Sequence, residues 1–225
     1  MPDKPTFMNE ALYEYVIDNF GCDDDFLIKL KEEAIINGLP NIFITPELGR
    51  FLQFYLKSIS AKYILEIGTL AGYSTIVMAR ALPASGKIYT IEINDRFADF
   101  AEKKIYESDV ADKVVLIRAD ARKFLKNTIF DNLFDFAFVD ANKPFYKFYL
   151  DVITPLLRVG GAFAADNAFA FGHILSTIPE KREDDIKSIK KFNSYFRNNE
   201  NYFTTMVSIG DGLIIGTKKP WWFFL

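Results

Sequence analysis

The sequence predicts an α/β protein: a Rossmann-like, doubly wound sheet of seven strands, mostly parallel, with an antiparallel C-terminal strand and extra N-terminal helices. Two observations predict this fold class. Between residues 62 and 165, apolar segments of strand length alternate with segments of helix length, which is typical of βαβ units. After residue 200, two more apolar segments flank Gly210-Asp211-Gly212, a turn sequence that favours an antiparallel pair at the sheet edge.

Three helices are expected before the first strand, because apolar side chains recur there at helical spacing. Their expected spans are residues 9–20, 26–36 and 45–58. Pro46 fits the first turn of the third helix, where its missing N–H costs nothing. We interpret residues 1–60 as a helical cover on a core of residues 61–219, all within one domain, 1–225. The sequence leaves open whether this cover lies over a ligand site or contacts a second subunit.

The strands are predicted from short apolar runs bounded by glycine or acidic residues. Their expected spans are 63–67, 87–92, 114–118, 134–140, 160–165, 202–209 and 213–218. The connecting helices are expected from Ser74, over 95–109, up to about Leu157, and over 180–196. Ligands on parallel sheets bind at the carboxyl ends of the strands. We therefore expect a site in the loops that follow Ile67, Glu92, Arg118, Asp140 and Ala165.

The composition of the chain excludes several classes of partner and of site. The net charge is −3 and the sequence pI is about 5.4, so nothing in the global charge favours a polyanionic partner such as nucleic acid. Cys22 is the one cysteine and His173 the one histidine, which excludes an intramolecular disulfide and a Cys/His metal cluster. The N-terminus lacks a signal-peptide pattern, and no apolar run reaches about 18 residues. We expect a cytoplasmic protein without a membrane span. The apolar tail 220–225 (PWWFFL) is expected to pack on its own domain or across a dimer.

The first predicted loop carries a nucleoside-cofactor pattern. It reads Glu66-x-Gly68-x-x-x-Gly72, whereas a dinucleotide loop would need glycine where Leu70 stands. This form matches S-adenosylmethionine sites, although two turn glycines also suit a generic strand–turn–helix. Glu92 ends the second strand, 24 residues after Gly68, where a carboxylate can accept both ribose hydroxyls and repel a 2′-phosphate. A solvated strand-end acid is the alternative.

The fourth and fifth strands end in a different set of polar residues. Asp140 follows one strand, and Asp166-Asn167 follows the next, so adjacent parallel strands would bring all three together. Two carboxylates and an amide oxygen suit Mg²⁺, and also Mn²⁺ or Ca²⁺. Lys143, three residues after Asp140, is within reach of the same pocket. Alternatively, Asp140 caps a helix and Asp166-Asn167 makes a turn.

Several motifs in order resemble one enzyme family. Five motifs follow one another between about Thr45 and Lys218: TPELGRFL, LEIGTLAGYST, FVDANKPFY, GGAFAADN and VSIGDGLIIG. Together they are similar to the metal-dependent class I O-methyltransferases of the caffeoyl-CoA type, with catechol O-methyltransferases as more distant relatives. Three features depart from the family pattern. Asn142 stands where an acid is usual, residues 168–173 lack the usual tryptophan, and the tail 220–225 is extra.

The resemblance implies a role for each matching residue, and a homodimer. Lys143 and Asp140 would be the catalytic groups, with Lys143 as general base or electrostatic helper. The GDGL turn would lie away from the chemistry. The remaining assignments are the methionine end of the cofactor to Glu66, Gly68 and Ser74, its ribose to Glu92, its adenine to Ala121, a further cofactor contact to Asp140, and the cation to Asp140, Asp166 and Asn167.

We therefore expect methyl transfer from S-adenosylmethionine to a hydroxyl of a small catechol-like or phenolic acceptor, assisted by a divalent cation. A second hypothesis makes hydroxylated uridine in transfer RNA the acceptor. It rests on a basic face formed by Lys187, Lys190, Lys191 and Arg197, which also reads as the solvated side of a helix. A third hypothesis is a non-catalytic cofactor-binding module that acts through interactions.

Overall fold

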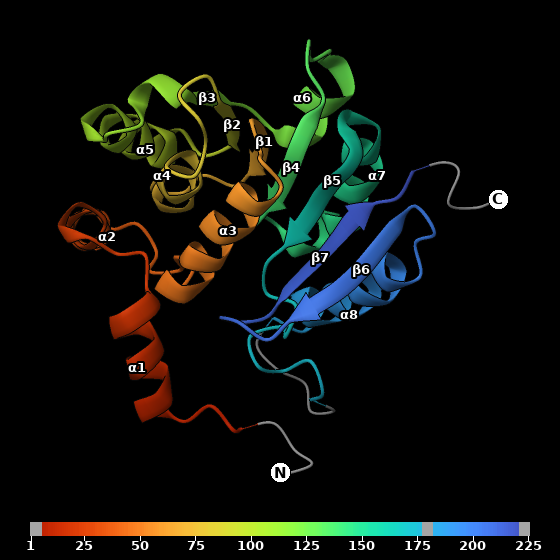
Figure 1. Ribbon diagram of the computed structural model, residues 1–225, viewed down its shortest axis with the longest axis horizontal. Helices are drawn as coiled ribbons and strands as arrows, with labels where there is room; N and C mark the ends of the chain where they lie inside the picture. Colours follow the sequence, from red (N-terminus) through yellow and green to blue (C-terminus); the bar gives the residue numbers. More distant parts are fainter. Residues whose placement is uncertain (1–5, 177–181, 221–225) are drawn as a thin grey trace.

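The computed structural model describes residues 6–176 and 182–220, and it contains the predicted seven-stranded sheet (Figure 1). The strand order is β3-β2-β1-β4-β5-β7-β6. The strands are β1 (Tyr63–Ile67), β2 (Lys87–Glu92), β3 (Val114–Arg118), β4 (Phe134–Val139), β5 (Leu157–Ala165), β6 (Tyr202–Val207) and β7 (Leu213–Lys218). The chain reverses its direction of winding between β1 and β4, which is where doubly wound sheets bind ligands.

The register of the sheet sets which strand ends meet. β1 to β5 run parallel, and Val139 of β4 pairs with Ala165 of β5, so the residues after these strands emerge side by side. β7 lies antiparallel to β5 and to β6, with Ala165 opposite Ile214. The start of β7 therefore lies at the same edge as the ends of β4 and β5, which brings the preceding turn to that edge.

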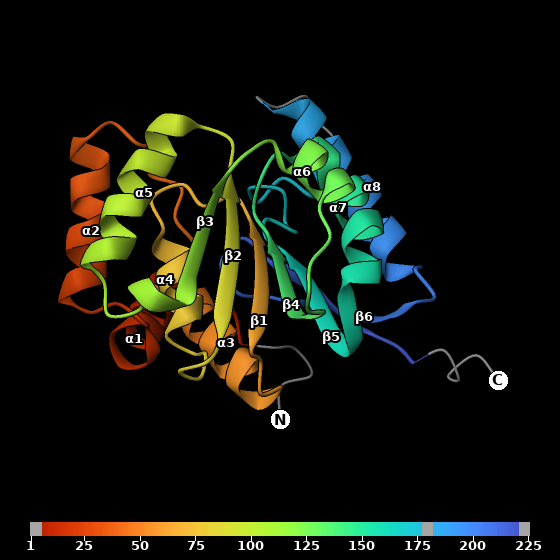
Figure 2. The same ribbon diagram turned by 90° about the horizontal axis from the view of Figure 1, so that it is seen from above.

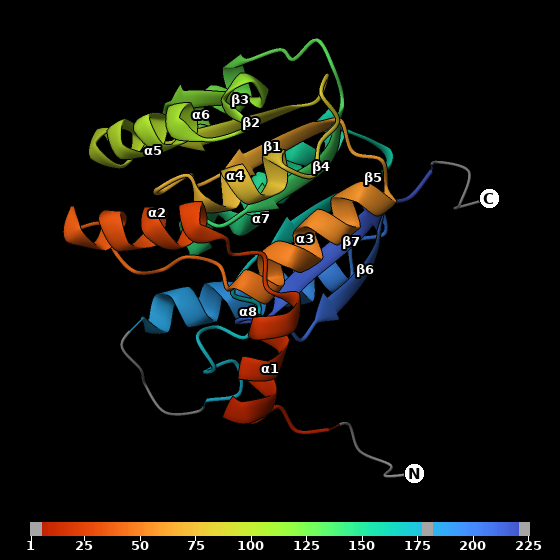
Figure 3. The same cartoon turned by 60° about the vertical axis from the view of Figure 1, so that its left-hand side comes forward.

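Helices cover both faces of the sheet (Figure 2). Those with residues in the larger apolar core are α2 (Asp25–Ile36), α3 (Pro46–Ser58), α4 (Tyr73–Ala79) and α5 (Asp95–Glu107). Those with residues in the second core, on the opposite face, are α6 (Ala121–Asn127), α7 (Tyr146–Ile153) and α8 (Glu183–Arg197). α1 (Glu10–Phe20) extends away from the sheet beyond α3 (Figure 3).

Some predicted boundaries were wrong. The helix after β4 does not run to Leu157: it ends at Ile153, because Pro155 lacks the N–H that a continuing helix needs, and a short 3₁₀ turn leads straight into β5. β5 consequently begins three residues before the predicted Gly160. α6 was not predicted, because a seven-residue helix with Ala121 and Leu125 as its buried residues shows little periodicity.

Two predictions fall outside the described residues. These are the packing of the tail beyond residue 220 and the start of the last helix at residue 180. Within residues 6–176 and 182–220, no helix combines the length and apolarity that a membrane crossing requires.

Candidate active site

A cavity of about 660 Å³ opens at the carboxyl edge of the parallel strands. The loops after β1 to β5 all contribute to its walls, as predicted from the topology. Three further segments line it that the sequence did not indicate: residues 42–45, just before α3; Arg182 and Asp185 at the start of α8; and the turn at Gly210 and Asp211. The cavity therefore lies between the sheet edge, the N-terminal cover and the β6–β7 turn.

The loop after β1 is built around glycines. Gly68 has a φ of 97°, and a Cβ at that position would lie 2.2 Å from the carbonyl oxygen of Asp140. No larger residue fits there without moving the adjacent loop. Gly72, at a φ of 84°, caps α4, and Leu70 adopts a left-handed φ of 50° although it carries a side chain. The loop thus brings its backbone close to the cavity and directs the amino end of α4 toward it.

Glu66 lies beneath this loop and does not reach the cavity surface. Its carboxylate is fully buried and accepts a hydrogen bond from the Ser74 hydroxyl at 2.6 Å and another from the Thr75 hydroxyl. Burial raises the pKa of Glu66 to about 7, with Ser74 and Thr75 opposing the rise. Ser74 itself lines the cavity. Glu66 therefore holds Ser74, a residue of the cavity wall, in place.

Glu92 lines the cavity as predicted, and it also holds the first loop in place. One carboxylate oxygen accepts from the backbone N–H groups of Thr69 at 3.1 Å and Leu70 at 2.9 Å. The other accepts from the backbone N–H of Asn94 at 2.9 Å. The two carboxylate oxygens have about four acceptor sites between them and three are used, so one remains, on the oxygen that accepts from Asn94, for a ligand hydroxyl. Glu92 links the ends of β1 and β2 into one rigid wall.

The wall after β3 combines apolar and cationic groups. Ala121 lines the cavity as predicted. Beside it, the Arg122 guanidinium forms a two-point ion pair with Asp120, at 2.9 and 2.6 Å, and stacks 4.3 Å from the centroid of the Phe145 ring. Phe145 and Tyr149 line the same side of the cavity. This gives a flat, aromatic and cationic surface, suited to a planar ring.

Asp140, Asp166 and Asn167 meet at the edge where β4 and β5 end, and all three line the cavity. Lys143 donates to an Asp140 carboxylate oxygen at 2.8 Å and to the Tyr146 hydroxyl at 2.7 Å. Burial acts to lower the pKa of Lys143, but Asp140 and Tyr146 outweigh it, so the pKa is raised and the ammonium form prevails.

The buried Asp166 carboxylate indicates what this edge is suited to bind. Its Oδ1 atom is buried and has no hydrogen-bond partner among the described residues. Burial and the nearby Asp140 charge together raise the pKa of Asp166 to about 7. An unpartnered, buried carboxylate oxygen beside a second carboxylate is costly unless a cation compensates it. Across the described residues no group of three or more acids, histidines or cysteines is placed to hold a metal ion, so the donor set considered is two carboxylates and the Asn167 carboxamide. These hard oxygen donors fit Mg²⁺, Mn²⁺ or Ca²⁺.

The β6–β7 turn was placed wrongly by the sequence analysis. It was expected away from the chemistry, yet Asp211 lines the cavity and accepts from the Asn167 side chain at 3.1 Å. The antiparallel insertion of β7 beside β5 causes this, because it carries the turn back to the end of β5. Asp-Gly is itself an ordinary turn sequence, so Gly-Asp-Gly gave no signal that the Asp211 side chain would reach the site.

The N-terminal segment also contributes to the cavity. Ile42, Phe43, Ile44 and Thr45 line it, and the Phe43 ring contacts the Tyr73 ring with centroids 5.9 Å apart. Residues just before α3 therefore cover part of the cavity, whereas no residue of α1 or α2 is among its lining residues. Of the four lining positions only Thr45 belongs to a motif, TPELGRFL, so the sequence did not single out the other three.

Comparison with known proteins assigns the chain to a family. The O-methyltransferase family profile matches residues 18–219, nearly the whole chain. The chain belongs to the O-methyltransferase family. This O-methyltransferase is 33% identical over 218 residues to the catechol O-methyltransferase of Niastella koreensis, covering 94% of this chain and 96% of the relative. It is 28% identical over 226 residues to the caffeoyl-CoA O-methyltransferase of Populus kitakamiensis, covering 96% of each.

Solved structures agree with the family assignment. The O-methyltransferase resembles the Bacillus cereus O-methyltransferase in complex with SAH, with a TM-score of 0.83 and 28% identity, covering 93% of this chain and 97% of the other. It also resembles TomG of Streptomyces achromogenes, an O-methyltransferase of tomaymycin synthesis in complex with SAM, with a TM-score of 0.83 and 27% identity, covering 95% and 100%. The predicted family and fold are thereby confirmed, and the chain is an O-methyltransferase.

Proposed function

We propose that this enzyme uses S-adenosylmethionine and a divalent cation, with Mg²⁺ as first choice, to methylate one hydroxyl of a small aromatic vicinal diol. The observation that carries the proposal is the buried, unpartnered Oδ1 of Asp166 beside Asp140 in a cavity walled by the Gly68 loop. A pocket that bound the cofactor alone would give no reason for a buried carboxylate oxygen without a hydrogen-bond partner. A vicinal diol offers two oxygens that one cation can hold together.

The cofactor fits the β1–β3 side of the cavity. Its carboxylate and amino groups suit the loop that begins at Gly68 and the first turn of α4, where Ser74 and free backbone amides are presented. Glu92 retains one acceptor site, which suits a ribose hydroxyl. Ala121 and Phe145 provide an apolar and aromatic surface for the adenine. These assignments follow the predicted roles, with Glu66 acting through Ser74.

Methyl transfer requires that the acceptor oxygen be aligned with the methyl group and that the acceptor hydroxyl lose its proton more readily. The sulfonium methyl is already electrophilic, so the enzyme must hold an oxygen in line with it. When bound, the cation would be held by Asp140, Asp166 and Asn167 and would lower the pKa of the acceptor hydroxyl. If a cation shared Asp140, the ion pair that keeps the Lys143 ammonium protonated would be weaker, and Lys143 could release its own proton to solvent before acting as general base. The neutral amine would then take the acceptor hydroxyl's proton, with the Tyr146 hydroxyl keeping it oriented, whereas as an ammonium Lys143 would stabilise the acceptor oxygen anion by its charge.

The two other hypotheses gain no support from the described residues. Of the basic residues on α8, Lys187 already pairs with Glu183 at 2.5 Å, and Lys190 donates to the carbonyl of Ser176 at 3.1 Å. The first turn of α8 is acidic, which disfavours a phosphate backbone there. The geometry of Asp140 and Lys143 argues against a decayed, non-catalytic site.

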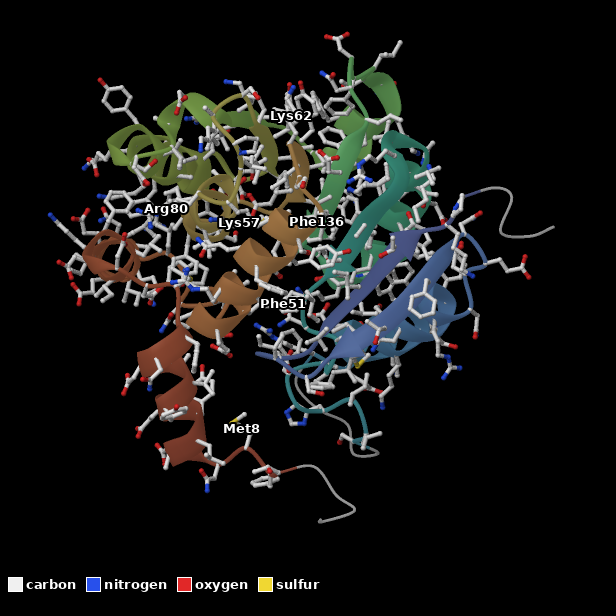
Figure 4. The ribbon with its side chains drawn as sticks, in the orientation of Figure 1. Met8, Phe51, Lys57, Lys62, Arg80 and Phe136 are labelled. Carbon is white, nitrogen blue, oxygen red and sulfur yellow. The ribbon has the colours of Figure 1, made fainter. Side chains whose placement is uncertain are left out.

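We further propose that the enzyme forms a homodimer through α1. Every residue of α1 is at least partly exposed, and its apolar side chains include Tyr15 at 58% and Phe20 at 58% exposure. The preceding Phe7 and Met8 are exposed at 85% and 56%, and Figure 4 shows Met8 well away from the core residues Phe51 and Phe136. An amphipathic helix that covers little of its own domain needs a partner, and a second copy supplies an identical helix.

The test is methyl transfer to 3,4-dihydroxyphenyl acceptors with chelator, without it, and with Mg²⁺ restored. We expect activity to be lost with chelator and regained with Mg²⁺, and the matched 4-hydroxyphenyl acceptor to be a poor substrate. Asp140→Ala should abolish the Mg²⁺-dependent turnover. Full activity in chelator would refute the cation, whereas equal activity on the two acceptors would refute the vicinal diol.

A further inference from the structure

Asp211 holds more of the site than its place in a surface turn suggests. Its carboxylate accepts three hydrogen bonds: from Asn167 Nδ2 at 3.1 Å, from the backbone N–H of Phe171 at 2.7 Å, and from that of Gly172 at 3.1 Å. All three donors belong to the loop that follows β5. One side chain from the β6–β7 turn therefore fixes both a proposed cation ligand and the loop beyond it.

The Asn167–Asp211 contact decides which way the carboxamide of Asn167 faces. A carboxamide has one donor end and one acceptor end, and the two are often hard to distinguish. A carboxylate oxygen can only accept, so the nitrogen of Asn167 must face Asp211. The Oδ1 atom is then the end of Asn167 left for a cation, and oxygen is the donor that Mg²⁺ requires.

Asp211 is itself rigidly placed. The β5–β7 pairing continues past its last strand residues, because Ala168 N–H donates to the Gly212 carbonyl and Phe169 N–H to the Asp211 carbonyl, both at 2.8 Å. Gly212 has a φ of 81°, and a Cβ there would lie 2.8 Å from the Phe169 ring. The turn thus cannot shift independently of the loop after β5.

The loop that Asp211 holds is also conformationally strained. Asn167, Ala170 and Phe171 have left-handed φ values of 62°, 54° and 59° although each carries a side chain. Asparagine tolerates this region, but alanine and phenylalanine lose roughly 1–2 kcal/mol each there. Strain of this kind persists only where the surroundings impose it, and the hydrogen bonds from Phe171 and Gly172 to Asp211 do so.

We propose that Asp211 is a positioning residue, which orients the Asn167 carboxamide so that its oxygen faces the cation site. This inference rests on the proposed function, since it assumes that Asn167 is a cation ligand. Partners that orient a metal ligand commonly change metal affinity by 10- to 100-fold when they are removed. Asp211 therefore sets cation affinity without touching the cation.

The test is the Kd for Mn²⁺, measured by electron paramagnetic resonance, with Mg²⁺ as competitor and with and without S-adenosylhomocysteine. We expect Asp211→Ala to weaken Mn²⁺ binding by about 10-fold or more. Asp211→Asn should lose less, because its carboxamide oxygen can still accept from Asn167. Both variants remove the same negative charge, so equal losses in the two would mean that charge alone matters and would overturn the proposal.

A double-mutant cycle shows whether Asp211 acts through Asn167. In the Asn167→Ala background, Asp211→Ala should change the Mn²⁺ Kd by less than about 2-fold, because the ligand it orients is gone. Additive losses would overturn the inference. Asp135→Asn is the matched control: it alters a carboxylate that accepts backbone N–H bonds at the opposite end of the sheet, and should lower Tm while leaving the Kd unchanged. If the unaltered protein binds no dication, the proposed cation site itself fails, which is a distinct outcome.

Discussion

Glu66→Gln should change the pH dependence of stability in a direction that can be worked out from the structure. Burial raises the pKa of Glu66 from 4.5 to about 7. Because the folded pKa lies above the unfolded value, the stability that the neutral carboxyl contributes is complete below pH 4.5 and is lost as the pH rises to 7. A rise of this size corresponds to about 3 kcal/mol of free energy of unfolding.

Glutamine keeps the shape of Glu66 without its charge. It also loses an acceptor: the carboxylate accepts from both Ser74 and Thr75, whereas a carboxamide oxygen accepts from one and its nitrogen must donate to the other. We assign about 1 kcal/mol to that loss. The variant should therefore be slightly less stable than the unaltered protein at pH 5, and more stable by about 2 kcal/mol at pH 8.

The assay is urea denaturation of both proteins, without cofactor, at pH 5, 6, 7 and 8. The quantity of interest is the difference in free energy of unfolding, because the contributions of all other titrating groups cancel in it. Ser74→Ala is the control, since it removes one hydroxyl donor but keeps the carboxylate: its stability should still fall with rising pH, and the fall should extend to higher pH because Ser74 opposes the rise in the Glu66 pKa. If the two stability curves run parallel from pH 5 to pH 8, Glu66 is not held near neutrality and the reasoning is refuted.

Three further predictions test other parts of the site. Lys143→Met should lower kcat by roughly 100-fold or more in single-turnover kinetics, and it should leave the Kd of S-adenosylmethionine nearly unchanged in calorimetry. A similar weakening of S-adenosylmethionine binding would contradict a catalytic role for Lys143. Gly68→Ala should lower the free energy of unfolding in urea by about 3 kcal/mol or more, because its Cβ would meet the Asp140 carbonyl oxygen at 2.2 Å. Gly172→Ala is the control: it has open space around it and should lower the free energy of unfolding by only about 1 kcal/mol. Similar losses in the two variants would count against the clash. Tyr15→Glu should shift the enzyme from dimer to monomer in light scattering with the fold intact, and an unchanged mass would remove α1 from the interface.

The strands were predictable because their sequences allow few other structures. β4 (Phe134–Val139) is buried along its whole length, and such continuous apolar runs are typical of the centre of a parallel sheet. The strand-end acids Asp140 and Asp166 could then be placed at one edge from topology alone, and both line the cavity. α6 escaped prediction because seven residues offer too little periodicity, although Asp120 caps it through the Arg122 N–H.

The missed parts of the site depend on tertiary placement. Asp211 lies 44 positions from Asn167, and only the insertion of β7 beside β5 brings them together. The sequence predicted the β6–β7 pair, but not which of its two strands would lie against β5. Glu66 illustrates a subtler limit. Its motif predicted a place at the methionine end of the cofactor, and the structure adds that its carboxylate lies beneath Ser74, a detail that depends on which face of β1 each residue occupies.

The two edges of the sheet differ in the partners that they give to their buried acids. Asp135 and Asp166 are both buried acids on neighbouring strands, at opposite ends. Burial acts to raise the pKa of Asp135 too, but the Arg158 ion pair and two backbone N–H groups outweigh it, so its pKa is lowered. Asp166 keeps an oxygen without a partner, and its pKa is raised to about 7. Asp166 lies deeper and has the Asp140 charge beside it, but among the described residues it also lacks an ion pair and has fewer backbone N–H donors than Asp135, so the carboxyl edge is short of partners which the amino edge has. Such a deficit destabilises the free protein, and it is the expected cost of a site whose missing partners are ligands.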